Sequence, residues 1–341
     1  INARGASVSD SDAANRSAMG SGRPDRPKSQ SALIPSPRAQ SAASWAFGIR
    51  VPACNSAEMV ERSTPVSRAR SACVTLRLAI ASASKWLSAL TLARLVERGH
   101  LRWDSTVGEF FPDAPAAMRP ITLVQLFSHT SGMVVDDVPC IADRFDTLQD
   151  CARKILAVPR VAAPGTVFAY GGNSMHVAGA MAELATGQAW DDLFIAQMVQ
   201  PLGLAQTDWT AGATRDGYVR NANPRIAGGA RSTLDDYGRV MDMLLAGGLH
   251  AGQSFLRADT LATMAVDRTE GLVIAYTPVP GYDFGYGIGQ WVEAKDAFGA
   301  TYRVSSPGAF GFTPWVDWQN GSSGVLLVSG NGGLMRDDLT A

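Results

Sequence analysis

The stretch IASASKWLSALTLARLVERGHL, residues 80 to 101, contains Ser82 and Lys85 three positions apart at the start of a predicted helix. Residues at this spacing lie on the same face of a helix. A serine hydroxyl becomes a useful nucleophile only when a base removes its proton, and a buried lysine can be that base. The first turn of a helix also presents unpaired N–H groups that favour a developing negative charge. The pair therefore predicts a nucleophile with its general base.

The helix is predicted from its apolar pattern and its stop signal. Gly99, directly after Glu97 and Arg98, is typical of the end of a helix of about 17 residues. The apolar residues at helical spacing are Trp86, Leu87, Leu90, Ala93 and Leu95. The pair alone has a second interpretation, because Ser82 could simply cap the helix in a chain rich in serine. The catalytic interpretation needs a second base and an oxyanion hole further along the chain.

Later segments offer those parts. ITLVQLFSHTSGM, residues 121 to 133, predicts a short helix that runs into a polar turn. PGTVFAYGGNSMHVAGAMAELATG, residues 164 to 187, places Tyr170 in a glycine-rich turn before another helix. Residues 305 to 330 predict two strands with a turn at 319 to 322. Each segment brings polar or glycine-rich sequence next to a regular element, where functional groups are usually held.

Residues 80 to 330 resemble the serine beta-lactamase-related family, which includes class C beta-lactamases, D-alanyl-D-alanine carboxypeptidases and family VIII carboxylesterases. The resemblance rests on several motifs that occur in the family's order. They are Ser82-Ala-Ser-Lys85, LFSHTSGM, PGTVFAY, NPRIAGGARST at 223 to 233, and SPGAFG ahead of a Trp-Val-Asp strand. It implies Ser82 as nucleophile, Lys85 as general base and Tyr170 as a second base or proton shuttle. It also implies an oxyanion hole from the N–H groups of Ser82 and Ala309.

Two positions depart from the family pattern. The asparagine usually found two residues after the tyrosine is Gly172 here, with Asn173 adjacent as a partial substitute. The third motif falls on Ser306-Pro307-Gly308, so Ser306 stands where the family has lysine or histidine. Both changes remove groups that hold the amide and the carboxylate of a lactam. The resemblance therefore implies hydrolysis of short-chain carboxylic esters through an acyl-enzyme on Ser82. The alternatives are a beta-lactamase or D-alanyl-D-alanine carboxypeptidase, and a non-catalytic binding protein with the penicillin-recognising fold.

The implied fold is of the α+β class, with an antiparallel sheet flanked by helices and an inserted all-helical domain. We expect the α/β domain at residues 73–104 and 273–341 and the helical domain at 105–272. Residues 1–72 are dominated by Ser, Arg, Ala and Pro, and we expect them to be disordered or unrelated to the fold. The N-terminal hairpin of the family's sheet is then expected to be absent, although residues 44 to 51 are a strand candidate.

Composition excludes several classes of function. A formal net charge of -1 and a pI near 6.5 offer no basic surface for nucleic acid, and no apolar run is long enough to span a membrane. We expect a small ester or lactam as the partner, and no metal or cofactor. No signal peptide is evident, so the compartment stays open between cytoplasm and periplasm or secretion. Cys140 and Cys151 could be bridged in an oxidising compartment, but free buried thiols are the preferred prediction.

For several other residues we predict a structural role rather than a functional one. His129 in SHTSG is predicted to fix a turn rather than to act in catalysis. The glycines of FGYGIGQW, residues 284 to 291, are predicted to lie in a strand, because no strand and helix frame them as a dinucleotide-binding loop. Phe310, Phe312 and Trp315 are predicted to be core residues.

Overall fold

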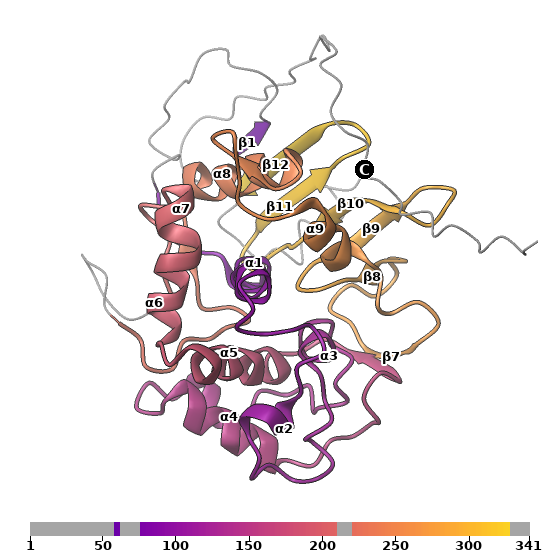
Figure 1. The fold of residues 1–341 in the computed structure, drawn as a ribbon. Coiled ribbons are helices and arrows are strands. Elements are labelled where there is room, and N and C mark those ends of the chain that lie inside the picture. Colours follow the sequence, from indigo (N-terminus) through magenta and orange to yellow (C-terminus); the bar gives the residue numbers. More distant parts are fainter. Residues whose placement is uncertain (1–57, 62–75, 210–219, 328–341) are drawn as a thin grey trace, which may run out of the picture. The chain divides into compact units, whose positions relative to one another are not determined.

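The main sheet has six strands among the residues that the structure describes. The computed structural model describes residues 58–61, 76–209 and 220–327, and all of them belong to one compact unit. The sheet is antiparallel, with the order β1-β12-β11-β10-β9-β8 (Figure 1). The strands are β1 Glu58–Glu61, β8 Gly285–Tyr286, β9 Trp291–Lys295, β10 Thr301–Ser305, β11 Phe312–Asp317 and β12 Ser322–Leu327.

The hairpin of β11 and β12 confirms the two strands predicted within residues 305 to 330. Phe312 and Val316 point into the core, which is the period of two expected for a strand with one buried face. Gly321 has a φ of 63° in the turn, where glycine carries no steric cost. The predicted glycine-rich strand is confirmed only for β8, since Gly287 and Gly289 follow it. Of the predicted core aromatics, Phe310 is exposed instead.

Strand β1 corrects the expectation for the first 72 residues. Residues 58–61 lie within that segment and pair in antiparallel register with β12, from Glu58 opposite Leu327 to Glu61 opposite Gly324. The segment therefore supplies an edge strand of the sheet, because backbone pairing needs no apolar pattern of its own. The candidate strand at 44 to 51 lies outside the described residues.

Helix α1, Ser84–Glu97, is the central element of the fold. Figure 1 shows it between the strands of the sheet and helices α2 to α5. Its residues from Ser84 to Leu95 are all buried, as expected for a helix that is covered on every side. It ends as predicted, with Gly99 at a φ of 76°.

Several of the helices that follow α1 begin at clear capping signals. Thr122, Thr147 and Thr233 each accept a hydrogen bond from the backbone N–H three residues on. The helices are α2 Val107–Phe110, α3 Leu123–Phe127, α4 Leu148–Ala157, α5 Asn173–Thr186, α6 Trp190–Phe194, α7 Gln200–Leu202, α8 Leu234–Leu245 and α9 Ala258–Ala265. Short turns are the 3₁₀ helices η2 Ala81–Ala83 and η3 Pro139–Ala142 and the π-helix η4 Ile195–Val199.

The expected helical domain is less separate than the sequence suggested. Helix α8 falls within residues 105–272, yet it packs on β11 and β12 of the sheet. Tyr237 of α8 meets Phe312 with ring centroids 5.0 Å apart, and Trp318 Nε1 donates to Leu244 O at 3.0 Å. The expected boundary at residue 272 therefore differs from the observed packing.

Three small sheets complete the described structure. Strands β2 Leu78–Ala79 and β4 Arg231–Ser232 are antiparallel. Strands β3 Val167–Ala169 and β7 Val273–Tyr276 are parallel, and β5 Leu249–His250 pairs with β6 Gln253–Ser254. The first two matter for function, because they lie directly next to the motifs that contain Ser82 and Tyr170.

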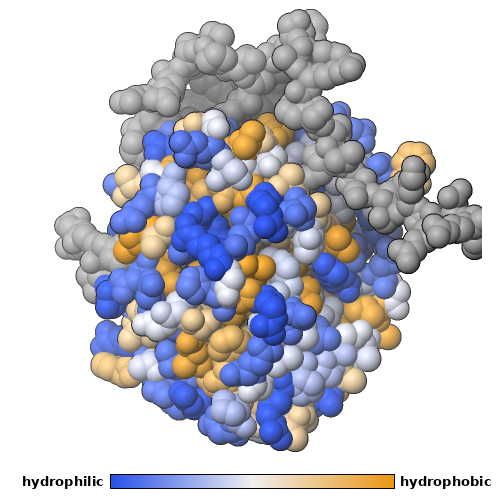
Figure 2. Space-filling model, viewed as in Figure 1, coloured by the Kyte–Doolittle hydropathy of each residue, from blue (hydrophilic) through white to orange (hydrophobic). Residues whose placement is uncertain are grey.

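Figure 2 shows one face of the molecule, coloured by the hydropathy of each residue. Hydrophobic residues there form small groups among hydrophilic ones. Among the described residues, no helix combines the length and the apolar character that a bilayer crossing requires.

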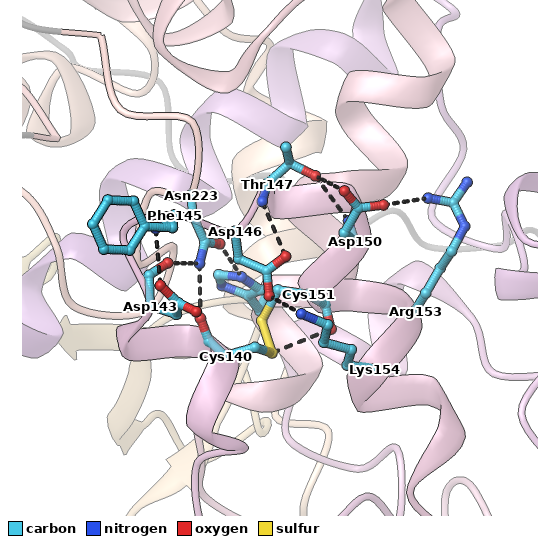
Figure 3. A network of polar contacts seen from close by, with 11 residues as sticks. Cys140, Asp143, Phe145, Asp146, Thr147, Asp150, Cys151, Arg153, Lys154 and Asn223 are labelled. Atoms are coloured by element: carbon cyan, nitrogen blue, oxygen red, sulfur yellow. Dashed lines mark hydrogen bonds and ion pairs between the residues drawn. A yellow bond between two sulfur atoms is a disulfide. The ribbon is translucent and has the colours of Figure 1, made fainter.

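A disulfide joins Cys140 of η3 to Cys151 of α4, so the prediction of free thiols is wrong (Figure 3). The 11-residue spacing gave no hint that the η3 turn folds back onto α4. With Asp146, these cysteines bring three possible metal-ligand atoms together. The sulfurs are bonded to each other, however, and cannot serve as thiolate ligands.

A buried amide connects this turn to the segment 223–233. Asn223 Nδ2 donates to Cys140 O and to Asp143 O, each at 2.8 Å (Figure 3). Its Oδ1 lies 2.9 Å from His176 Nε2 of α5. Because the Oδ1 atom can only accept, His176 is the donor and its Nε2 carries a proton. The start of the segment 223–233 is thereby fixed to two other elements.

Removing the disulfide should destabilise the fold. Closing a loop of this length reduces the entropy of the unfolded chain by an amount worth about 3 kcal/mol. The double variant Cys140→Ser/Cys151→Ser should lose about that much free energy of unfolding in urea titrations. Dithiothreitol should lower the stability of the wild type and leave the double variant unchanged. Equal stability of the oxidised wild type and the double variant would contradict the bridge.

Protonation of His176 should weaken the fold in acid. Burial lowers its pKa to about 4, from an ordinary value of 6.5. Between these values the unfolded state binds more protons, so the free energy of unfolding rises with pH from about 4 to 6.5 and then levels off. His176→Gln keeps a donor for Asn223 and should remove roughly 3 kcal/mol of that change. Urea titrations across this range measure it, with the exposed His100→Gln as control. A pH dependence that survives unaltered in His176→Gln would contradict the assignment.

Candidate active site

Ser82 lies in the 3₁₀ turn η2, directly before α1. The residue before it, Ala81, has a φ of 45°, a left-handed conformation that costs a residue with a side chain about 1–2 kcal/mol. Ala81 and Ala83 are buried, whereas Ser82 is partly exposed. A strained backbone thus holds the Ser82 hydroxyl at the surface of an otherwise buried turn.

Lys85 lies one helical turn further on and faces Ser82. Its Nζ donates to Ser82 Oγ at 3.1 Å and to the carbonyl oxygen of Ala227 at 2.8 Å. The lysine is only 4% exposed, so these acceptors replace most of the water that its amine would otherwise bind. The structure therefore brings the predicted nucleophile and its predicted base within hydrogen-bond distance.

Segment 223–233 holds the start of α1 in place. Ile226 O accepts from Ser88 Oγ at 2.8 Å, and Ala230 N donates to Ser84 Oγ at 3.0 Å. Strand β4 at its end pairs with β2, which leads into the η2 turn. The sequence motif NPRIAGGARST is thus the support against which α1 and Lys85 are positioned.

Tyr170 follows β3 and lies beside Lys85. The Lys85 Nζ is 4.7 Å from the centre of the Tyr170 ring. That ring stacks on Trp291 of β9, with centroids 5.3 Å apart and planes at 16°. The backbone N–H of Tyr170 donates to Tyr276 O of β7 at 3.1 Å. Stacking on one side and the strand on the other restrict where the tyrosine hydroxyl can lie.

His129 and Tyr286 are buried behind Tyr170. Their ring centroids are 4.4 Å and 5.9 Å from that of Tyr170. Burial, and to a smaller extent the charge of Lys85, hold the pKa of His129 well below its ordinary value, so the ring is neutral at pH 7. Its Nδ1 accepts from Gly171 N at 3.4 Å, and its Nε2 has no partner among the described residues. The contact with Gly171 fits the predicted role in fixing a turn.

The third motif lies against the η2 turn. Ser306 Oγ donates to the carbonyl oxygen of Ser82 at 3.3 Å and is 3% exposed, so its hydroxyl fixes the backbone of the nucleophile. A Cβ on Gly308 would lie 2.1 Å from Ile80 O, which only glycine avoids. Ala309 is exposed, and its N–H has no backbone acceptor in the part of the chain that the structure describes.

Asn173 has a different environment from the one expected. Its Nδ2 donates to Val134 O at 2.9 Å and Asp136 O at 2.8 Å, and its Oδ1 accepts from Val138 N at 3.1 Å. The side chain is 1% exposed. These bonds use the amide to hold the loop 134–138, so no donor of this side chain is left for a substrate.

Three residues of this centre carried no sequence assignment. They are Ala227, which accepts from Lys85, Trp291, which stacks on Tyr170, and Asp137, whose carboxylate lies beside Gly172. The motif around Ala227 was recognised but had no role, and a backbone acceptor has no side-chain signature. An aromatic residue at position 291 was visible in GQW, but only the fold places it opposite Tyr170.

The chain matches known proteins over most of its length. Esterase EstB of Burkholderia gladioli is 28% identical over 308 residues, which cover 73% of this chain and 76% of EstB. AmpH of Escherichia coli K12, a D-alanyl-D-alanine-carboxypeptidase/endopeptidase, is 25% identical over 251 residues. That match covers 68% of this chain and 64% of AmpH, which is less than two-thirds of its length.

The solved structures agree with the fold. A candidate beta-lactamase from Bacteroides dorei DSM 17855 superimposes with a TM-score of 0.65 and 32% identity, covering 74% of this chain and 78% of that one. Its likeness supports the beta-lactamase/transpeptidase type of α+β fold. The sequence model of the Beta-lactamase family matches residues 58–341. Because this match includes β1, α1, the helices and the whole sheet, the protein belongs to the beta-lactamase family.

Proposed function

We propose that the protein is a serine hydrolase that cleaves short-chain carboxylic esters through an acyl-enzyme on Ser82. The observation that carries the proposal is the 3.1 Å hydrogen bond between Lys85 Nζ and Ser82 Oγ in an otherwise buried centre. A serine needs such a neighbour to lose its proton during attack. The match to esterase EstB supports a hydrolase of this kind.

Each catalytic step is assigned to groups that the fold holds together. Ser82 Oγ bonds to the ester carbonyl carbon while its one proton passes to the neutral amine of Lys85, directly or through the Tyr170 hydroxyl. The N–H groups of Ser82 and Ala309 bind the oxyanion. Breakage of the C–O bond releases the alcohol, which takes up the proton and leaves the acyl group on Ser82. Water then attacks the acyl carbon, gives its proton to the same pair, and frees the acid and the serine.

Preference for esters over lactams follows from charge. A lactam antibiotic brings a carboxylate into the site, and Ser306 offers no cation for it. A further cation on the segment that holds Lys85 is Arg225, two residues before Ala227. Its Nη2 lies 3.7 Å from Asp137 Oδ2, so its charge is partly offset. Neutral short esters need no such cation, so the missing charge costs them nothing.

The alternative function is that of a beta-lactamase or D-alanyl-D-alanine carboxypeptidase. The match to AmpH favours it, and the proposed nucleophile and base would serve that chemistry as well. The two functions differ in whether the substrate carries a carboxylate. A direct comparison of neutral and anionic substrates therefore separates them.

We expect p-nitrophenyl acetate and butyrate to be hydrolysed with a higher kcat/KM than a chromogenic cephalosporin. A charge-assisted hydrogen bond stabilises a bound carboxylate by about 1.5 to 3 kcal/mol, so its absence costs about one to two decades in kcat/KM. Ser306→Lys should shift the ratio of the two kcat/KM values toward the cephalosporin. Steady-state absorbance assays measure both substrates.

Ser306→Ala is the matched control, because it removes the hydroxyl without adding a cation. It should leave the ratio of ester to cephalosporin unchanged. A melting curve of each variant shows whether the protein is still folded. Efficient turnover of the cephalosporin by the wild type, together with poor ester hydrolysis, would support the alternative function instead.

A further inference from the structure

A carboxylate occupies the space beside Gly172, the position at which the family usually has asparagine. A Cβ built on Gly172 would lie 2.6 Å from Asp137 Oδ1 and 3.4 Å from its Cγ. A longer side chain at position 172 would need that same space. Gly172 is only two residues from Tyr170, so the Asp137 carboxylate lies beside the turn that follows Tyr170.

The loop that carries Asp137 is held firmly. The three hydrogen bonds of the buried Asn173 amide fix the backbone at Val134, Asp136 and Val138, on both sides of Asp137. Close packing adds to this, since a Cβ on Gly171 would lie 3.0 Å from Val135 O. The loop therefore holds the backbone of Asp137 in a fixed position beside the turn after Tyr170.

Asp137 remains available to a ligand. Its ion pair with Arg225 has an N–O separation of 3.7 Å, which is longer than a hydrogen bond. The two side chains are 47% and 54% exposed, and pairs this exposed contribute little. The carboxylate thus keeps acceptor sites that face solvent near the active site.

At both positions that depart from the family pattern, the candidate active site is more negative than the family pattern predicts. Ser306 is a neutral residue where the family has a cation, and the carboxylate of Asp137, weakly paired with Arg225, fills the space beside Gly172. We propose that Asp137 forms a subsite for an ammonium group on the acyl part of the substrate. Together the two residues favour acyl groups with a protonated amine, such as aminoacyl esters, and disfavour acyl groups with a carboxylate. The inference rests on the proposed function, because it assigns specificity to the same site.

Boronic acids test the subsite, because they add reversibly to a nucleophilic serine. Phenylboronic acid has no charged group on its ring. 3-(Aminomethyl)phenylboronic acid adds an ammonium group, and 3-carboxyphenylboronic acid adds a carboxylate. Their inhibition constants are measured in competition with p-nitrophenyl butyrate at pH 7. We expect the ammonium compound to bind about tenfold more tightly than the carboxylate compound, the lower end of the effect of a hydrogen bond to a charged group.

Asp137→Asn should abolish this ratio, because the amide keeps the shape of the side chain without its charge. Asp136→Asn is the matched control, since Asp136 is exposed on the same loop, and it should keep the ratio. Equal inhibition by all three compounds, or a ratio that Asp137→Asn leaves intact, would overturn the subsite alone. Absence of inhibition by every compound would overturn both the subsite and the proposed serine hydrolase.

Discussion

A buried lysine amine sets the requirements for the rest of this centre. Lys85 is 4% exposed, so its amine loses most of its hydrogen bonds to water, and this costs free energy unless protein groups replace them. Ser82 Oγ and Ala227 O are the acceptors that the fold supplies. Ala227 can lie there only because the segment 223–233 is bound along the start of α1. The same interaction that satisfies the lysine thus aligns the serine.

The candidate site also requires that two connections between strands lie very close to α1 and to the residues before it. Gly308 lets the turn after β10 lie against Ile80 O, and Gly289 lets the connection between β8 and β9 lie on α1, where a Cβ would be 2.5 Å from Ala89 Cβ. The β8–β9 connection therefore touches α1, and the β10–β11 connection touches Ile80, just before the turn that holds Ser82. The site is built from elements far apart in the chain, and a side chain at either glycine would separate them.

Sequence patterns predicted the elements that are determined by interactions between neighbouring residues. The helix with Lys85, which begins just after Ser82, followed from its periodicity and its glycine stop signal, and the last two strands followed from the turn between them. Long-range pairing was not predictable in this way. The partner of Lys85 is a backbone carbonyl 142 residues away, the Cys140–Cys151 bridge depends on how a turn folds back, and β1 is a strand because β12 offers it hydrogen bonds. Tertiary contacts decided each of these, and they leave little trace in composition or spacing.

The central claim is that Ser82 forms a covalent acyl-enzyme. Intact mass of the protein after treatment with a fluorophosphonate, followed by peptide mapping, tests it most directly. The account predicts one phosphonyl group on each chain, attached to Ser82, and no adduct on the Ser82→Ala variant. An adduct that persists in Ser82→Ala would contradict the assignment of the nucleophile. Absence of any adduct on the wild type would instead favour a non-catalytic binding protein with this fold.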